Sequence, residues 1–341
     1  MKWKAIIGAT LLAASSVAWC GPEDKISGND VFTQPKKEFE FGKLKYLKKS
    51  DTIIIPTVVV RLQNWGTQGA MSQTRGNAAT QTAKARSTLT VAVDPKVAQE
   101  LATSLQKDLV EKMRAAGWKV LTEADIRDSK SYQKLKWEKD SELGQGLDVE
   151  KADGKVFGIG TADSSGSGYY IAVPEGQKML KYGITGPAWA MKKVAKEFKA
   201  SLFIPTYTIN TMYFDADEDT SIFGNRASAS VDSGPLVMLE NVSVIYLNPK
   251  FAGSGMSLTG KGMYRNNGVA GGEVKQAKDT SPSAANALGA MFRAVGGAGI
   301  KASSSEMVIE SDEAVLKAEA LRLAKGYNDI AARASALYIG K

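Results

Sequence analysis

The stretch 87-STLTVAVDPKVAQELATSLQKDLVEKMRAAGWKVLTEADI-126 decides the fold, because strand-like and helix-like patterns alternate along it. Residues 87–93 are apolar and β-branched at many positions, which predicts a strand. Asp94 is a favourable N-cap and Pro95 suits the first helical position, so a helix is expected over 95–116. One face of this helix is apolar, at Val97, Leu101, Leu105, Leu109, Met113 and Ala116.

A second strand and a second helix follow. Gly117 is a typical helix stop, and the short run 118–121 predicts a strand. Thr122 opens the next helix, with Asp125 three residues later. Residues 87–135 therefore predict the order strand, helix, strand, helix, which is typical of an α/β fold.

Upstream of this stretch, residues 52–62 are almost wholly apolar and predict a buried strand, with Pro56 at an edge or a bulge. Residues 63–86 are rich in Gln, Thr, Asn, Gly and Ala, and no acidic residue occurs between Asp51 and Asp94. A mobile polar loop is expected there, and the alternative is a positive, adaptable surface for a partner. The cations of that surface are Arg61, Arg75, Lys84 and Arg86.

Downstream, helices and strands are separated by polar segments. The expected elements are a charged loop over 134–155, a hairpin over 156–173, a helix over 188–199, strands over 202–214, 236–247 and 254–265, a polar loop over 266–283 and a small-residue helix over 284–295. The fold class that results is α/β, with α+β as the alternative, in which helices pack on a mixed sheet.

The last predicted element is a long helix over 312–338, capped by Ser311 and with Asp312 and Glu313 in its first turn. It carries a heptad-like apolar seam at Leu316, Ala320, Leu323, Tyr327, Ile330, Ala334 and Leu337. We expect the seam to lie on the sheet of its own domain. The alternative is a helix–helix contact between subunits, which would make a homo-oligomer through helix 312–338.

The N-terminus has the pattern of a secretory signal peptide, because Lys2 and Lys4 precede an uncharged, mostly apolar stretch over 5–17. Cleavage after Cys20 is expected, and cleavage after Ala18 also fits the small-residue rule. Lipidation of Cys20 is a third alternative.

No later segment is long and apolar enough to predict a transmembrane helix. A membrane contact is therefore expected only if Cys20 is lipidated or if segment 284–300 inserts. The predicted parts of the chain are a signal peptide over 1–20, an N-terminal arm over 21–50, an α/β domain with long polar loops over 51–283 and a C-terminal helical segment over 284–341.

The composition excludes several classes of enzyme. The 341-residue chain has no histidine and one cysteine, so it lacks the residues of a Ser-His-Asp triad, a Cys-His pair or a His-ligated zinc site. Its 44 Lys and Arg against 36 Asp and Glu give a net charge of +8. We predict no catalytic residue, no cofactor-binding residue and no metal ligand.

Three motifs could suggest a site, and none is predicted to form one. Gly255–Lys261 matches G-x4-GK but lacks the following Ser or Thr and the helix of a phosphate-binding loop. Lys-rich stretches near 134–139 and 191–199 do not alternate with aromatic residues, which disfavours nucleic acid. A solvated loop rather than a calcium site is expected for the acidic residues Asp215, Asp217, Glu218 and Asp219.

Three segments carry a resemblance to a known family. Met113–Glu123 runs from a helix through glycine to a short strand, Val194–Ala200 is a helix leading into a strand, and a hairpin joins Val242–Tyr246 to Met256–Gly260. These segments resemble the α/β domain shared by the curli secretion channel family (CsgG), the TolB N-terminal domain and related outer-membrane lipoproteins. The resemblance is topological, and it implies a role in assembly or secretion machinery.

These observations predict an exported, non-enzymatic protein of the cell envelope. It is expected in the periplasm or at the periplasmic face of the outer membrane, acting through contacts with other envelope proteins and not with nucleic acid. The alternative is a periplasmic binding protein for a small or anionic ligand, with a pocket between the sheet and the long loops. A histidine-independent enzyme is the third class considered.

Overall fold

The computed structural model describes residues 50–75, 80–137, 147–151, 166–181, 186–220, 227–247, 256–257, 264–265, 272–279, 300–337 and 339. The predicted signal peptide, Cys20, most of the N-terminal arm and the predicted helix over 284–295 lie outside these residues.

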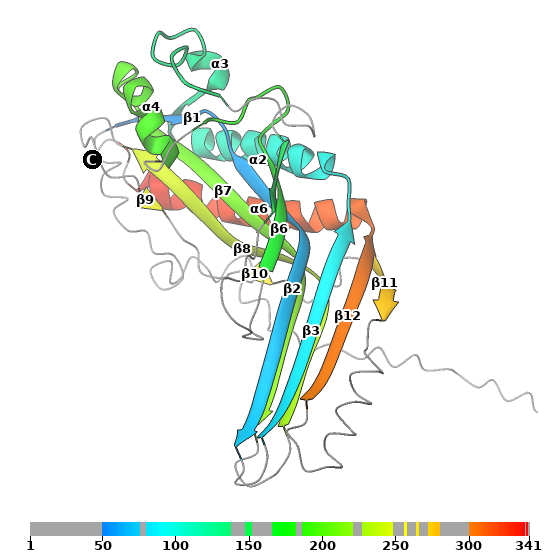
Figure 1. Ribbon diagram of the computed structural model, residues 1–341. Helices are drawn as coiled ribbons and strands as arrows, with labels where there is room; N and C mark the ends of the chain where they lie inside the picture. The colour runs from blue at the N-terminus through cyan, green and yellow to red at the C-terminus, as the bar shows by residue number, and fades with distance from the viewer. Residues whose placement is uncertain are drawn as a thin grey trace, which may run out of the picture.

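A mixed sheet of 12 strands forms the centre of the protein (Figure 1). The main path runs β10-β8-β7-β2-β3-β12-β11, and β1 pairs in parallel with both β4 and β7. The strands are β1 (Thr52–Ile55), β2 (Val59–Arg75), β3 (Thr80–Ala92), β4 (Lys119–Thr122), β5 (Leu147–Lys151), β6 (Gly166–Ala172), β7 (Ser201–Thr220), β8 (Ala227–Leu247), β9 (Met256–Ser257), β10 (Tyr264–Arg265), β11 (Gly272–Asp279) and β12 (Ile300–Ser311). The described helices are α2 (Lys96–Ala115), α3 (Glu123–Ile126), α4 (Gly186–Glu197) and α6 (Glu313–Ala336).

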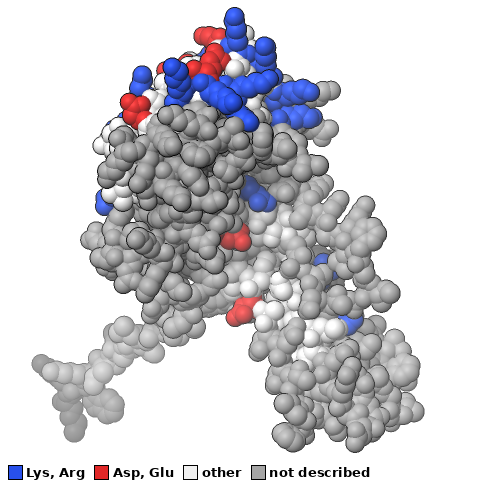
Figure 2. Space-filling view, turned by 90° about the vertical axis from the view of Figure 1, so that its left-hand side faces the viewer, with Lys and Arg blue, Asp and Glu red and all other residues white. Residues whose placement is uncertain are grey.

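Helices cover both faces of the sheet around β1 and β7. Ile53 and Ile55 lie in a large core in which α2 and α6 pack together. Ile54, between them, lies in a second core with residues of α4 and of the loop after α3. Neighbouring strand residues point to opposite faces, so the two cores lie on opposite sides of the sheet. Lys and Arg side chains gather on the end of the molecule that carries α3 and α4 (Figure 2).

The elements of the deciding stretch are confirmed, and with them the α/β fold class. The helix predicted over 95–116 is α2, and its apolar face is buried. Asp94 Oδ1 accepts the N–H of Lys96 at 2.8 Å, as an N-cap does. The strand predicted over 118–121 is β4, whereas the helix at Thr122 is α3, a single turn.

The predicted strands over 202–214 and 236–247 are also confirmed. The observed strands are longer, because β7 continues to Thr220 and β8 already begins at Ala227. The helix over 188–199 is α4, and Met191, Val194 and Ala195 are buried in the second core. Of the strand predicted over 254–265, the described residues form β9 and β10, which both pair with β8.

The prediction of a loop over 63–86 is wrong, because these residues form most of the antiparallel pair β2–β3. The register runs from Trp65 opposite Thr90 to Arg75 opposite Thr80. The inward side chains are small, including Ala70, Ala83 and Ala85, which are all buried. Such strands lack the large apolar residues by which a sequence pattern indicates a buried strand.

The strand predicted over 52–62 is divided at Pro56 into β1 and β2, because proline has no N–H for the ladder. β5 lies in the predicted loop 134–155. It pairs with β6. The hairpin that was expected within 156–173 is therefore formed by β5 and β6, and its first strand lies before residue 156.

Two further corrections concern the last third of the chain. β11 lies in the predicted polar loop 266–283, and β12 lies in the segment 284–341 that was expected to be helical. β12 pairs in parallel with β3 and antiparallel with β11, so this segment contributes to the central sheet.

The C-terminal helix α6 packs mainly through its apolar seam. Leu316, Ala320, Leu323, Tyr327 and Ile330 are buried in the large core, and Ala334 packs against it, whereas the side chain of Leu337 is 64% exposed. The seam therefore lies within its own domain, as expected. The N-cap is Asp312 and not Ser311, since Asp312 Oδ1 accepts the N–H groups of Ala314 and Val315.

The start of α3 leads to a prediction about pH. Asp125 accepts hydrogen bonds from the N–H and the Oγ1 of Thr122, at 2.7 and 2.8 Å, and these bonds lower the pKa of Asp125. A lowered carboxyl pKa stabilises the fold above the unfolded pKa, and the gain is lost as pH falls through the folded value. Asp125→Asn should lower the free energy of unfolding near neutral pH by less than the ~1 kcal/mol typical of a cap, because Asp125 is exposed.

Urea unfolding of Asp125→Asn and of the unmodified protein, across acid and neutral pH, measures this effect. The difference should disappear in acid, where the aspartic acid is protonated. A difference that stays constant over the whole range would show that the charge of Asp125 is not what matters.

Candidate functional site

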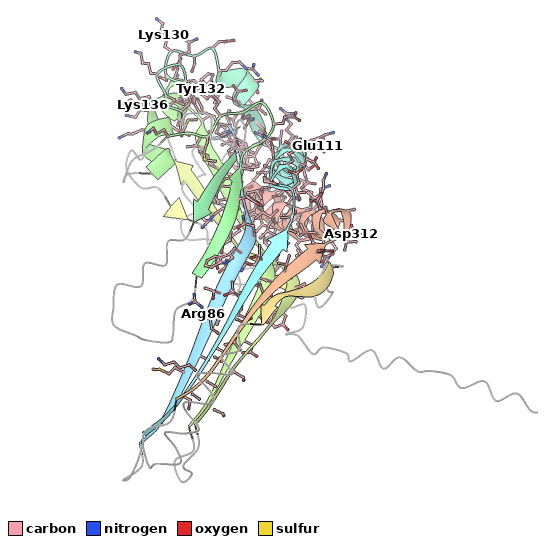
Figure 3. All side chains as sticks on the ribbon, turned by 45° about the vertical axis from the view of Figure 1, so that its right-hand side comes forward. Arg86, Glu111, Lys130, Tyr132, Lys136 and Asp312 are labelled. Atoms are coloured by element: carbon pink, nitrogen blue, oxygen red, sulfur yellow. The ribbon has the colours of Figure 1, made fainter. Side chains whose placement is uncertain are left out.

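Five strands run on past the helices and form a two-layered projection (Figure 1, Figure 3). We call it the sheet extension. It comprises residues 65–75, 80–90, 212–220, 227–235 and 300–308. β2, β3 and β12 form one layer, and the long antiparallel pair β7–β8 forms the other.

The two layers approach closely where at least one of the facing residues is small. Ser87 Oγ lies 2.7 Å from Ser233 Oγ and joins β3 to β8. A Cβ atom at Gly66 would lie 2.7 Å from the ring of Phe214 and 2.9 Å from Sδ of Met212, so glycine is what allows β7 to pack against β2 there. The extension is thus a packed structure and not a mobile loop.

The four cations of the alternative partner surface lie on strands of the central sheet: Arg61 and Arg75 on β2, and Lys84 and Arg86 on β3. The guanidinium of Arg61 lies 4.5 Å from the ring centroid of Tyr169 in β6. Arg86, labelled in Figure 3, is exposed on the outer face of β3 and donates from Nε to Thr67 Oγ1 at 3.1 Å. Lys84 is half-buried on the same face of β3. The structure therefore presents Lys84 and Arg86 on a rigid strand.

The extension ends in strand edges that are open within the described residues. β2 pairs with β6 as far as Thr67, and within the described part of the chain residues 68–70 pair with β3 and no longer with β6. On the other side of the layer, β12 pairs with β11 from Ser305 onward, and residues 300–304 pair with β3 alone. Such edges present backbone N–H and C=O groups that can bind a further strand. The sequence pattern does not reveal these edges, because it predicts a loop over 63–86 and no strand over 300–311.

The acidic residues Asp215–Asp219 do not form the solvated loop that was expected, because they continue β7 opposite Asp232–Ser228 of β8. Among the residues that the structure describes, no group of His, Cys, Asp and Glu is arranged to hold a metal ion. Most of Gly255–Lys261 lies outside those residues.

A buried chain of polar groups joins the sheet to both long helices. Tyr207 OH donates to Asn328 Oδ1 at 2.5 Å, and Asn328 Nδ2 donates to Asp108 Oδ2 at 2.8 Å. Asp108 is 3.0 Å from Nζ of Lys112, which also donates to the carbonyl of Lys325. Burial, aided by Tyr327 and Asp108, raises the pKa of Tyr207 well above its ordinary value, so its hydroxyl stays protonated and donates. The chain fixes β7, α2 and α6 relative to one another.

No described helix is both long enough and apolar enough to cross a bilayer. When the chain was compared with protein families, with curated proteins and with solved structures, none of the three comparisons gave a match.

Proposed function

We propose that the protein is an exported, non-enzymatic component of the cell envelope that acts by protein–protein contacts in assembly or secretion. The sheet extension is the contact element, and it binds by adding a strand of another chain to an open edge. The observation that carries this proposal is residues 68–70 of β2, which within the described residues pair with β3 and lie beyond the last residue of β2 that pairs with β6.

Three further features support the proposal. The extension projects beyond the described helices, so within the described residues no helix covers its far end (Figure 1). The sequence has no histidine, which removes the commonest general base of hydrolytic enzymes. The resemblance described above implies the same class of role. Export, the envelope location and the lack of enzymatic activity are parts of the proposal.

Single-cysteine crosslinking tests the contact. Cys20 is the one natural cysteine, so in a Cys20→Ala background Met71→Cys places a single thiol on β2 next to residues 68–70. A thiol–amine crosslinker applied to intact cells should join this variant to a second copy or to another envelope protein. Lys107→Cys, on the exposed surface of α2, is the matched control and should give no such product.

Three results would count against the proposal. Recovery of the full-length precursor from the cytosol, with its N-terminus uncut, would contradict export. Equal crosslinking from both thiols would contradict a specific edge. No product from Met71→Cys in cells that export the protein would contradict the contact itself.

A further inference from the structure

A group of lysines lies at the end of the molecule opposite the sheet extension. We call it the basic platform. Figure 2 shows Lys and Arg side chains over this end, and Figure 3 labels Lys130 and Lys136 among them. Its members are exposed and come from the loop after α3 and from α4 and its end: Lys130, Lys134, Lys136, Lys193, Lys196 and Lys199.

The described residues of this end carry an unbalanced charge. Described residues 123–137, 175–181 and 190–199 contain ten Lys and Arg against five Asp and Glu. The fold itself uses three of the five carboxylates. Asp125 binds Thr122, and Glu123 pairs with Arg127 at 3.1 Å. Glu197 Oε2 accepts the N–H of Ser131 at 3.2 Å.

The six platform lysines have no ion pair and no side-chain hydrogen bond within the described part of the chain. Their charge therefore remains available to an external anion, whereas most of the nearby carboxylates are already engaged.

The platform rests on a rigid base. Tyr132 of the loop and Met191 and Val194 of α4 are buried in the same core, and the ring of Tyr132 packs on Trp137 at 5.2 Å between centroids. The bond from Ser131 to Glu197 joins the loop directly to α4. Two lysine-rich stretches that are far apart in the sequence are thereby held on one surface.

The residue types indicate what this surface binds. All six cations are lysines, and lysine is depleted in protein–protein interfaces, where arginine and aromatic residues are enriched. The large hydrophobic side chains that are exposed in the described residues, Val315 and Leu337, both belong to α6 and its C-terminal end and not to the platform. Clusters of four to eight basic residues are known to bind anionic lipid headgroups where they lie beside a membrane, with about 1 kcal/mol contributed by each Lys or Arg near the surface.

We propose that the basic platform binds the anionic surface of a phospholipid bilayer. The contact is electrostatic and peripheral, and it requires neither lipidation of Cys20 nor insertion of segment 284–300. It is also independent of strand addition at the sheet extension, so either proposal can fail without the other.

Co-sedimentation of the full exported chain with lipid vesicles tests the platform. The protein should bind vesicles that contain phosphatidylglycerol, should not bind pure phosphatidylcholine, and should dissociate as salt is raised because the contact is screened. Each lysine near an anionic surface strengthens binding by about fivefold. The triple variant Lys134→Gln/Lys193→Gln/Lys196→Gln should therefore bind about a hundredfold more weakly.

The control variant Lys96→Gln/Lys107→Gln/Lys325→Gln removes the same charge from exposed positions of α2 and α6 and should bind like the unmodified protein. All six substitutions are at exposed side chains, and matched thermal unfolding curves verify that both variants fold. Three results would overturn the inference: no binding of the unmodified protein to anionic vesicles, equal losses in the two triple variants, or binding to an acidic protein or to DNA but not to vesicles.

Discussion

Leu323→Ala is expected to lower the free energy of unfolding by about 2–5 kcal/mol, which is the cost of a leucine-sized cavity in a packed core. The side chain of Leu323 is 3% exposed and belongs to the core shared by α2, α6 and the sheet. Urea unfolding measures the change. Because the seam lies on its own domain, the loss should be the same at low and at high protein concentration.

Leu337→Ala is the matched control, since it removes the same atoms from the same predicted seam. The side chain of Leu337 is 64% exposed, so the free energy of unfolding should change by no more than about 0.5 kcal/mol. Two outcomes would contradict this account of the helix: similar losses in both variants, or a stability of the unmodified protein that rises with its concentration. The second would favour the homo-oligomer through helix 312–338, which stays untested.

Asn328→Leu is expected to cost up to about 3 kcal/mol, because it leaves the buried hydroxyl of Tyr207 without its acceptor. Tyr207→Phe should cost about 1–3 kcal/mol for the converse reason, since the amide oxygen of Asn328 then loses its donor. In the double variant both the hydroxyl of Tyr207 and the amide oxygen of Asn328 are gone, so neither is left buried without a partner. Its loss should therefore be smaller than the sum of the single losses by about 1 kcal/mol or more.

Urea unfolding of the four proteins in this cycle measures the coupling energy. Losses that add, within about 0.5 kcal/mol, would show that the two side chains do not stabilise each other and that the effect of Asn328 comes from its other contacts, such as Asp108. Thr103→Ala serves as a control for polar substitution on α2, because the side chain of Thr103 is exposed and bonds to Gln99 and Glu175.

The long helices could be predicted because each buries large apolar side chains at helical spacing. Leu101, Leu105 and Leu109 indicate α2 from their spacing alone, and the seam residues Leu316 and Leu323 indicate α6. Runs of apolar residues likewise indicate β1, β4 and those parts of the long strands that helices cover.

The sheet extension could not be predicted in this way. Its inner side chains are largely Ala and Ser, which fit between two closely packed sheets but also occur in loops. Residues 300–305 of β12, IKASSS, have the same character. What makes these segments strands is their pairing with β3 along the extension. β2 pairs with β3 locally, but its small and polar residues resemble those of a loop, and the partner of β12 is so distant in sequence that it leaves no local pattern.

The sequence shows the two lysine-rich stretches of the basic platform but not that they lie on one surface. The lysine-rich stretches near 134–139 and 191–199 stand out, but each alone suggests only a solvated surface. Their combination depends on the second core, where Tyr132 and Val194 meet below the platform. Only the tertiary structure brings the two sets of charges together.

The parallel pairing of β12 with β3 has a consequence for how the chain folds. Ile300 lies opposite Thr82, so most of the polypeptide separates two neighbouring strands. Such non-local pairing is slow to form, since a long segment must be ordered before the contact is gained. Until β12 arrives, the β2–β3 hairpin keeps an extra free edge and is vulnerable to pairing with the wrong chain. A chain synthesised from its N-terminus leaves that hairpin unfinished until residues 300–311 have been made, so a protective chaperone is most valuable during that interval of its biogenesis.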